Sequence, residues 1–124
     1  MYIFIYLNKG DLFDEGQWCN EFQFFEYTSR FSHLFETPNT TKLYVVPGNH
    51  DVGFHYALSR YTLDRFENIF NVSSVELLNL KDNLFILINS MAMENDGCFF
   101  CSEAEKKIKN LASMYLLNNY ENSK

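Results

Sequence analysis

Two short apolar runs, at residues 3–7 and 43–46, each end in a turn that contains glycine and carries polar side chains. The first turn presents Asp11, and the second presents Asn49 and His50. Uninterrupted apolar runs of this length are typical of parallel strands that are covered on both faces. Because ligands of open α/β sheets bind outside the carboxyl ends of the strands, we expect both turns to face one crevice.

Apolar residues that recur every three or four positions predict a helix over residues 17–36. This helix ends before Pro38, because proline restricts the residue before it and lacks an N–H donor. Trp18, Phe22 and Phe25 form one apolar stripe on the helix. We expect this stripe to face the core rather than a lipid surface.

Two further helices follow from the same periodicity. A turn at residues 51–53 precedes a second helix, which is marked by apolar positions between residues 58 and 70. A capping box with Ser102 at the cap and Glu105 three residues later opens a last helix, which runs through Tyr115.

Residues 75–80 and 84–89 read as a hairpin with a turn at residues 81–83. The order of elements is therefore strand, helix, strand, helix, strand, strand, helix, which predicts an α/β or α+β layered fold. We assign residues 1–117 to one partial domain and residues 118–124 to a polar tail.

Composition limits the partners that we expect. Hydrophobic residues make up 47% of the chain and charged residues 21%, which is typical of a globular protein, and the net charge of −6 argues against nucleic acid. No segment approaches the roughly 20 apolar residues of a membrane span. The first seven residues lack the basic region and cleavage site of a signal peptide, so we predict no targeting signal in this sequence.

The residue types at the two turns suit phosphoester chemistry. A carboxylate such as Asp11 can bridge two divalent metal ions, and the carbonyl oxygen of Asn49 can bind one ion without adding charge. His50 can give a proton or a hydrogen bond to a departing oxygen. Asp11 and Asp14 could equally cap the turn and the helix that follows it.

The sequence Gly10-Asp11-x-x-Asp14, followed after the second strand by residues 48–51 (Gly-Asn-His-Asp), resembles two motifs of the calcineurin-like metallophosphoesterases. Four longer runs narrow the match to the branch that removes ethanolamine phosphate from GPI anchors: residues 11–18, 48–56, 65–67 and 96–102. The resemblance covers residues 10–115.

The resemblance implies a partial metallophosphoesterase fold with two divalent metal ions, expected to be Mn²⁺. It makes Asp11 and Asn49 metal ligands and His50 the catalytic residue, with Asp14 and Asp51 in supporting roles. It also implies a phosphodiester substrate, namely the glycan of GPI-anchored proteins, and a lumenal site at the membrane of the endoplasmic reticulum or Golgi.

The sequence also departs from the family pattern. The first motif, Asp-x-His, and the later Gly-His-x-His have no counterpart, and the only histidines are His33, His50 and His55. The chain therefore resembles the middle of such an enzyme, and we expect weak or no metal binding by this chain alone. The alternative is a non-catalytic remnant or a phosphate-binding module on the same scaffold.

The pair Cys98-x-x-Cys101 leaves three interpretations open. It lacks the second cysteine pair of a zinc site, and Cys19 alone would not complete four ligands. A redox pair has some support from the position of Cys101 near a helix start, although no thioredoxin-like context surrounds it. The lumenal site that the resemblance implies favours a local disulfide, with Cys19 left as a free thiol.

Overall fold

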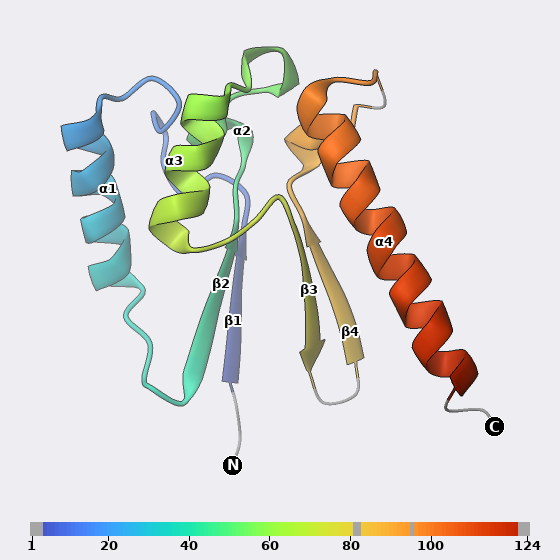
Figure 1. Ribbon diagram of the computed structural model, residues 1–124. Helices are drawn as coiled ribbons and strands as arrows, with labels where there is room; N and C mark the ends of the chain where they lie inside the picture. Colours follow the sequence, from blue (N-terminus) through green and yellow to red (C-terminus); the bar gives the residue numbers. More distant parts are fainter. Residues whose placement is uncertain (1–3, 81–82, 95, 122–124) are drawn as a thin grey trace. The chain divides into compact units, whose positions relative to one another are not determined.

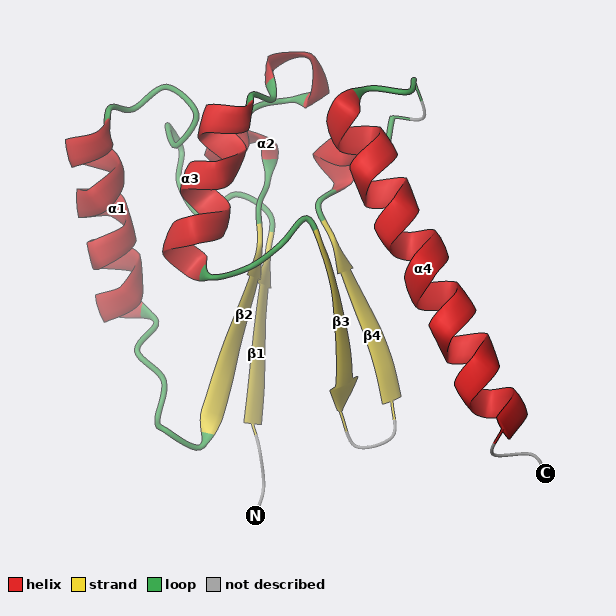
Figure 2. Ribbon diagram, in the orientation of Figure 1, coloured by secondary structure: helices red, strands yellow, loops and turns green. Residues whose placement is uncertain are grey.

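The computed structural model describes residues 4–80, 83–94 and 96–121 (Figure 1). The described chain contains both helices and strands, which confirms the predicted mix of α and β structure (Figure 2). The chain divides into two compact units, Met1–Ser73 and Ser74–Lys124, which are described separately below. Among the described helices, none has the length and apolar character that crossing a bilayer requires.

The first unit is built around a parallel pair of strands. Strand β1 (Phe4–Lys9) pairs with β2 (Thr41–Val46). Their register places Lys9 opposite Val46, so both strands end at the same edge. Both predicted strands are confirmed, although Ile3 at the start of the first lies outside the described residues.

Helix α1 (Glu21–Leu34) connects the two strands and begins later than we predicted. Asn20 caps it, because its side-chain oxygen accepts the N–H of Gln23 at 3.0 Å. In turn, the side-chain oxygen of Gln23 accepts the N–H of Asn20. Residues 16–18 instead form a turn, in which the N–H groups of Trp18 and Cys19 donate to the carbonyl of Glu15.

The prediction that Trp18, Phe22 and Phe25 face the core is wrong. These side chains are 72%, 70% and 64% exposed, whereas Phe24 and Phe31 are buried on another face of α1. The reason lies outside the helix, in the loop before it. Phe13 is buried there and lies edge-on to Phe24 and Phe31, with ring centroids 5.6 and 6.3 Å apart. It therefore selects which aromatic face of α1 packs inward.

Three short elements complete the first unit. Residues 49–52 form a single helical turn, α2 (Asn49–Val52), where we predicted a turn at residues 51–53. Gly53 ends it with a φ of +102°. A 3₁₀ turn (His55–Ala57) leads into α3 (Arg60–Phe70), which confirms the second predicted helix and is capped by Ser59.

The second unit contains a hairpin and a long helix. Strands β3 (Val75–Leu80) and β4 (Asn83–Ile88) pair antiparallel as predicted, and residues 81–82 of the turn lie outside the described residues. A 3₁₀ turn (Ser90–Ala92) precedes α4 (Phe99–Glu121). The core of this unit is formed by apolar side chains from all of these elements except β4: Val75, Ala92, Phe100, Ala104, Ile108 and Leu111.

The predicted capping box at Ser102 is wrong, because α4 begins at Phe99. Ser102 lies within the first turn, and its N–H donates to the carbonyl of Cys98 at 2.8 Å. The residue that precedes the helix is therefore Cys98. At the other end, α4 continues to Glu121, past residue 118, where we divided the polar tail from the domain.

Candidate functional site

The two glycine turns meet at the carboxyl ends of β1 and β2. The N–H of Gly10 donates to the carbonyl of Val46 at 3.3 Å, which extends the pairing of the strands by one residue. Beyond this bond, Oδ1 of Asp11 accepts the backbone N–H of His50 at 2.9 Å. The two predicted turns thus meet at one edge of the strand pair, where this bond joins Asp11 to His50 although 39 residues separate them in sequence.

Gly48 permits this close approach. A Cβ atom at position 48 would lie 2.1 Å from Oδ1 of Asp11 and 2.6 Å from its backbone nitrogen. Both distances are well inside van der Waals contact, so any larger residue would push the two turns apart. Gly16 plays a similar part farther along the first turn, because a Cβ there would lie 2.9 Å from Cα of Asp51.

A buried carboxylate, Asp51, joins the two turns. Its Oδ1 accepts the N–H groups of Leu12 and Phe13 at 3.0 and 2.9 Å, and its Oδ2 accepts the N–H of Gly48 at 2.8 Å. Burial raises the pKa of Asp51 to about 6, and the charge of Asp11 adds to that rise, while the three N–H groups oppose it. Asp51 therefore fixes the backbone from which both Asp11 and His50 project.

The His50 ring is oriented by the first turn. Its Nδ1 lies 2.8 Å from the backbone carbonyl oxygen of Asp14, and a carbonyl can only accept a hydrogen bond. We therefore assign the proton of the neutral ring to Nδ1, which leaves the lone pair on Nε2. The exposed Trp18 ring lies edge-on to the imidazole, with centroids 6.4 Å apart.

The remaining predicted site residues lie at the same edge. Asn49 is the first residue of α2 and is half-buried, and the carboxylate of Asp14 is exposed. Asp11 and Asn49 offer oxygen atoms, the donors that hard divalent ions prefer, so the residues present fit such an ion. They provide only part of a coordination shell within the described residues. Their roles as ligands, and the catalytic role of His50, stay predictions.

We assigned no role to Arg65 from the sequence. Its guanidinium group is buried and holds the first turn by hydrogen bonds to the backbone. It donates to the carbonyls of Gly16 and Cys19 at 2.6 and 3.0 Å, and its Cζ lies 4.2 Å from the centroid of the Phe24 ring. The available signal was an arginine on the apolar face of α3, directly before the fully buried Phe66.

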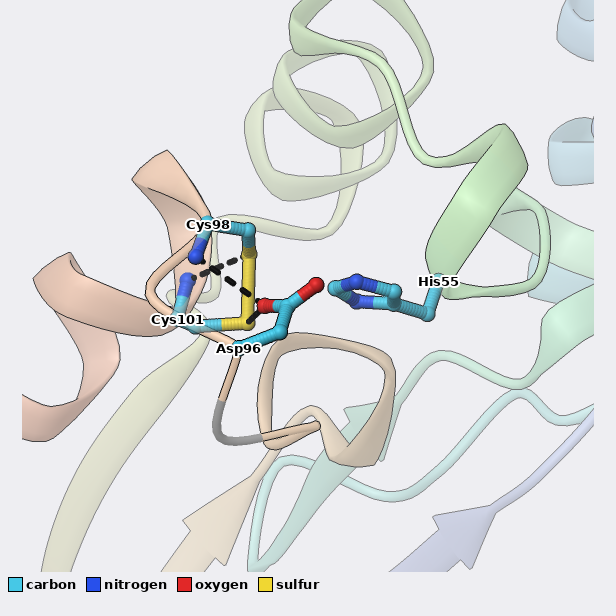
Figure 3. Close-up of side chains that lie close together, drawn as sticks. All are labelled: His55, Asp96, Cys98 and Cys101. Atoms are coloured by element: carbon cyan, nitrogen blue, oxygen red, sulfur yellow. Dashed lines mark hydrogen bonds between the residues drawn. A yellow bond between two sulfur atoms is a disulfide. The ribbon is translucent and has the colours of Figure 1, made fainter.

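The three cysteines differ in environment. Cys98 and Cys101 form a disulfide at the start of α4 (Figure 3). Cys19 is a buried free thiol in the first unit, and burial raises its pKa. Its Sγ donates to the carbonyl of Gly16 at 3.2 Å. The pairing that we expected from the resemblance is the one that the structure contains.

Comparison with known proteins finds relatives of high sequence identity. Metallophosphoesterase 1 homolog of Drosophila melanogaster is 50% identical over 103 residues, which is 83% of this chain and 28% of the fly protein. Metallophosphoesterase 1 of Gallus gallus is 46% identical, over 80% of this chain and 25% of its own length. The mouse protein of that name is 45% identical, over 83% of this chain and 26% of its own length. The chain thus spans about a quarter of the relatives it matches.

No solved structure gives a significant match to the chain. The family model for calcineurin-like phosphoesterases, in contrast, matches residues 2–120, which is almost the whole sequence. The resemblance inferred from the two glycine turns is therefore confirmed, and the chain belongs to the calcineurin-like phosphoesterase family.

Proposed function

We propose that this chain forms part of a metal-dependent phosphoesterase. The observation that supports the proposal best is the clamp made by Asp51, which accepts N–H groups from both glycine turns. The clamp holds Asp11 within hydrogen-bonding distance of the His50 backbone. A buried carboxylate that orders two turns from distant parts of the chain is typical of a site that needs fixed geometry.

The side chains at this edge would divide the work between metal binding and proton transfer. Asp11 and Asn49 would hold divalent ions, which the family implies and which act as Lewis acids on phosphoryl oxygens. His50 presents Nε2 away from the carbonyl that holds Nδ1. In its protonated form, this nitrogen would donate to the oxygen that leaves the phosphorus atom.

The finer assignment rests on the resemblance and on the names of the relatives. We propose Mn²⁺ as the metal and a lipid-linked phosphodiester, the ethanolamine phosphate of GPI glycans, as the substrate. We also propose a lumenal location at the membrane of the endoplasmic reticulum or Golgi. The disulfide between Cys98 and Cys101 supports an oxidising compartment.

Metal binding by this chain alone should be weak and local. Two side chains, Asp11 and Asn49, give fewer oxygen donors than a tight site uses. We would therefore follow a Mn²⁺ titration by NMR, because the paramagnetic ion broadens the signals of nearby amides even when affinity is low. We expect the amides of residues 11, 49 and 50 to broaden first.

The matched variants are Asp11→Ala and Asp64→Ala, since Asp64 is a carboxylate on α3 outside the two turns. Asp11→Ala should abolish the selective broadening, and Asp64→Ala should leave it unchanged. Hydrolysis of bis(p-nitrophenyl) phosphate with added Mn²⁺ then separates an enzyme from a phosphate-binding remnant. Equal broadening in the wild type and in Asp11→Ala would refute the proposed metal site.

A further inference from the structure

The second unit contains a pair of cysteines that the phosphoesterase proposal does not use. The Cys98–Cys101 disulfide lies at the start of α4, the longest helix of the described residues. A cross-link between residues three positions apart removes little freedom from the unfolded chain, because such residues already lie close together. Stabilising the fold is therefore a weak reason for this bond.

The two sulfur atoms differ in their access to solvent. Cys101 is completely buried, whereas Cys98 is partly exposed. An external thiolate can therefore approach the disulfide only from the side of Cys98. Reactive cysteine pairs need one accessible sulfur, because exchange begins with an attack along the disulfide bond.

The backbone around Cys98 favours its thiolate form. Cys98 directly precedes α4, and its Sγ accepts the N–H of Cys101 at 3.0 Å. The first N–H groups of a helix carry a partial positive charge, and α4 is 23 residues long. A thiolate at Cys98 would gain from both effects. Stabilising the reduced form in this way makes a disulfide easier to reduce.

Asp96 offers a second contact to the reduced form. Its Oδ1 accepts the N–H of Cys98 at 3.0 Å and lies 3.5 Å from Sγ of Cys101 (Figure 3). A disulfide sulfur has no proton to donate, so this second contact is not a hydrogen bond in the oxidised protein. Once Cys101 carries a proton, its thiol can donate to the carboxylate.

We propose that Cys98 and Cys101 form a thiol–disulfide exchange site for an external dithiol. A thiolate of the dithiol attacks Sγ of Cys98, and the Cys98–Cys101 bond breaks as the mixed disulfide forms. Cys101 leaves as a thiolate and takes a proton from solvent. The second thiol of the dithiol, once deprotonated, attacks the mixed disulfide and releases Cys98 as a thiolate. Two electrons pass from the dithiol to the protein, and the dithiol leaves as a disulfide.

The first test is an equilibrium with mixtures of reduced and oxidised glutathione, a thiol probe that exchanges by the same chemistry. The samples are quenched with acid and alkylated, and mass spectrometry of the peptides separates Cys98 and Cys101 from Cys19. We expect the pair to become reduced in glutathione mixtures while the chain stays folded. Structural disulfides resist reduction by glutathione, so a pair that stays oxidised in a large excess of reduced glutathione would overturn the proposal.

Two single variants test which sulfur reacts. Cys101→Ser leaves Cys98 at the helix start, and Cys98→Ser leaves Cys101 in the core. At pH 7, Cys98 in the first variant should react readily with iodoacetamide. Cys101 in the second variant should react at least about ten times more slowly than Cys98. Equal rates for the two cysteines would contradict the proposed asymmetry, and the glutathione equilibrium decides the matter if a variant does not fold.

Discussion

The contribution of Arg65 to the candidate site can be tested by measuring the free energy of unfolding. Replacing it with alanine removes a guanidinium that donates to the carbonyls of Gly16 and Cys19 and stacks on Phe24. The Cys19 carbonyl, left without this donor, costs about 1–3 kcal/mol, and the Gly16 carbonyl, which keeps only the weak thiol donor of Cys19, costs about 1 kcal/mol. The lost cation–π contact costs about 1 kcal/mol. We expect Arg65→Ala to lower the free energy of unfolding by about 4 kcal/mol. The ion pair with Glu21 adds little, because the Glu21 side chain is largely exposed.

Arg65→Lys should cost about half as much. An ammonium group can still bond one of the two carbonyls, but it lacks the planar fork that reaches both and lies on the Phe24 ring. Arg60→Ala is the matched control, because Arg60 lies on the same helix and forms an exposed pair with Asp64. That change should cost less than about 0.5 kcal/mol.

Urea denaturation followed by circular dichroism measures all three variants, and the fluorescence of Trp18, the only tryptophan, reports on the first unit. The Gly16 turn is tied to His50 through the N–H of Gln17, which donates to the His50 carbonyl at 2.9 Å. The imidazole NMR signals of His50 should therefore move in Arg65→Lys and stay in place in Arg60→Ala. The reasoning is refuted if Arg65→Ala and Arg60→Ala unfold at the same urea concentration.

Three further predictions concern the same unit. The folded pKa of Asp51 is raised to about 6 from an unfolded value of about 3.9, so the stability that its protonated form contributes is present below the unfolded pKa and is lost as pH rises through the folded pKa. The wild-type stability should therefore fall by about 2 kcal/mol between about pH 4 and 6, and by about 3 kcal/mol in all by about pH 7, relative to Asp51→Asn, as measured by urea denaturation at several pH values. Gly48→Ala should cost about 2–3 kcal/mol and abolish the selective Mn²⁺ broadening, because the added Cβ would meet Oδ1 of Asp11 at 2.1 Å. Gly97→Ala meets no atom within 4 Å but forces alanine to a φ of +73°, so it should cost about 1–2 kcal/mol by the same assay and keep its broadening. Asn20→Ala should cost about 1 kcal/mol, measured by thermal denaturation, because it removes the cap of α1. An unchanged melting temperature would show that the cap does not stabilise the protein.

Local sequence patterns correctly predicted those elements near the site that depend on residues close together in the chain. The apolar runs before Gly10 and Pro47 became β1 and β2, and their turns met at one edge as parallel strands require. The helix stripe failed for a non-local reason. Periodicity identifies several aromatic faces on α1, and side chains from outside the helix decide which of them is buried. The buried face is contacted by Phe13, Arg65 and Phe70.

The same distinction explains the other differences. The motif at Ser102 predicted a helix start there, but α4 begins at Phe99, and the N–H of Ser102 already donates to the carbonyl of Cys98. Asp51 stands out in the sequence as part of a motif, and Arg65 stands out as a charged residue on the apolar face of a helix. Their bonds to Leu12 and to Gly16 span 39 and 49 residues, and no local pattern predicts contacts of that range.

The range of the Asp51 clamp has a consequence for the order in which the protein folds. Closing a loop of 39 residues costs roughly 3 kcal/mol of chain entropy before Leu12 and Asp51 can bond. The β1–β2 pair joins residues 37 positions apart, such as Lys9 and Val46, so pairing of the strands meets nearly the whole of this cost and the clamp forms once the pair has brought the turns together. Substitutions at Gly48 or Asp51 should then speed unfolding and leave the folding rate nearly unchanged. The candidate site would be the last part of the unit to assemble and the first to open.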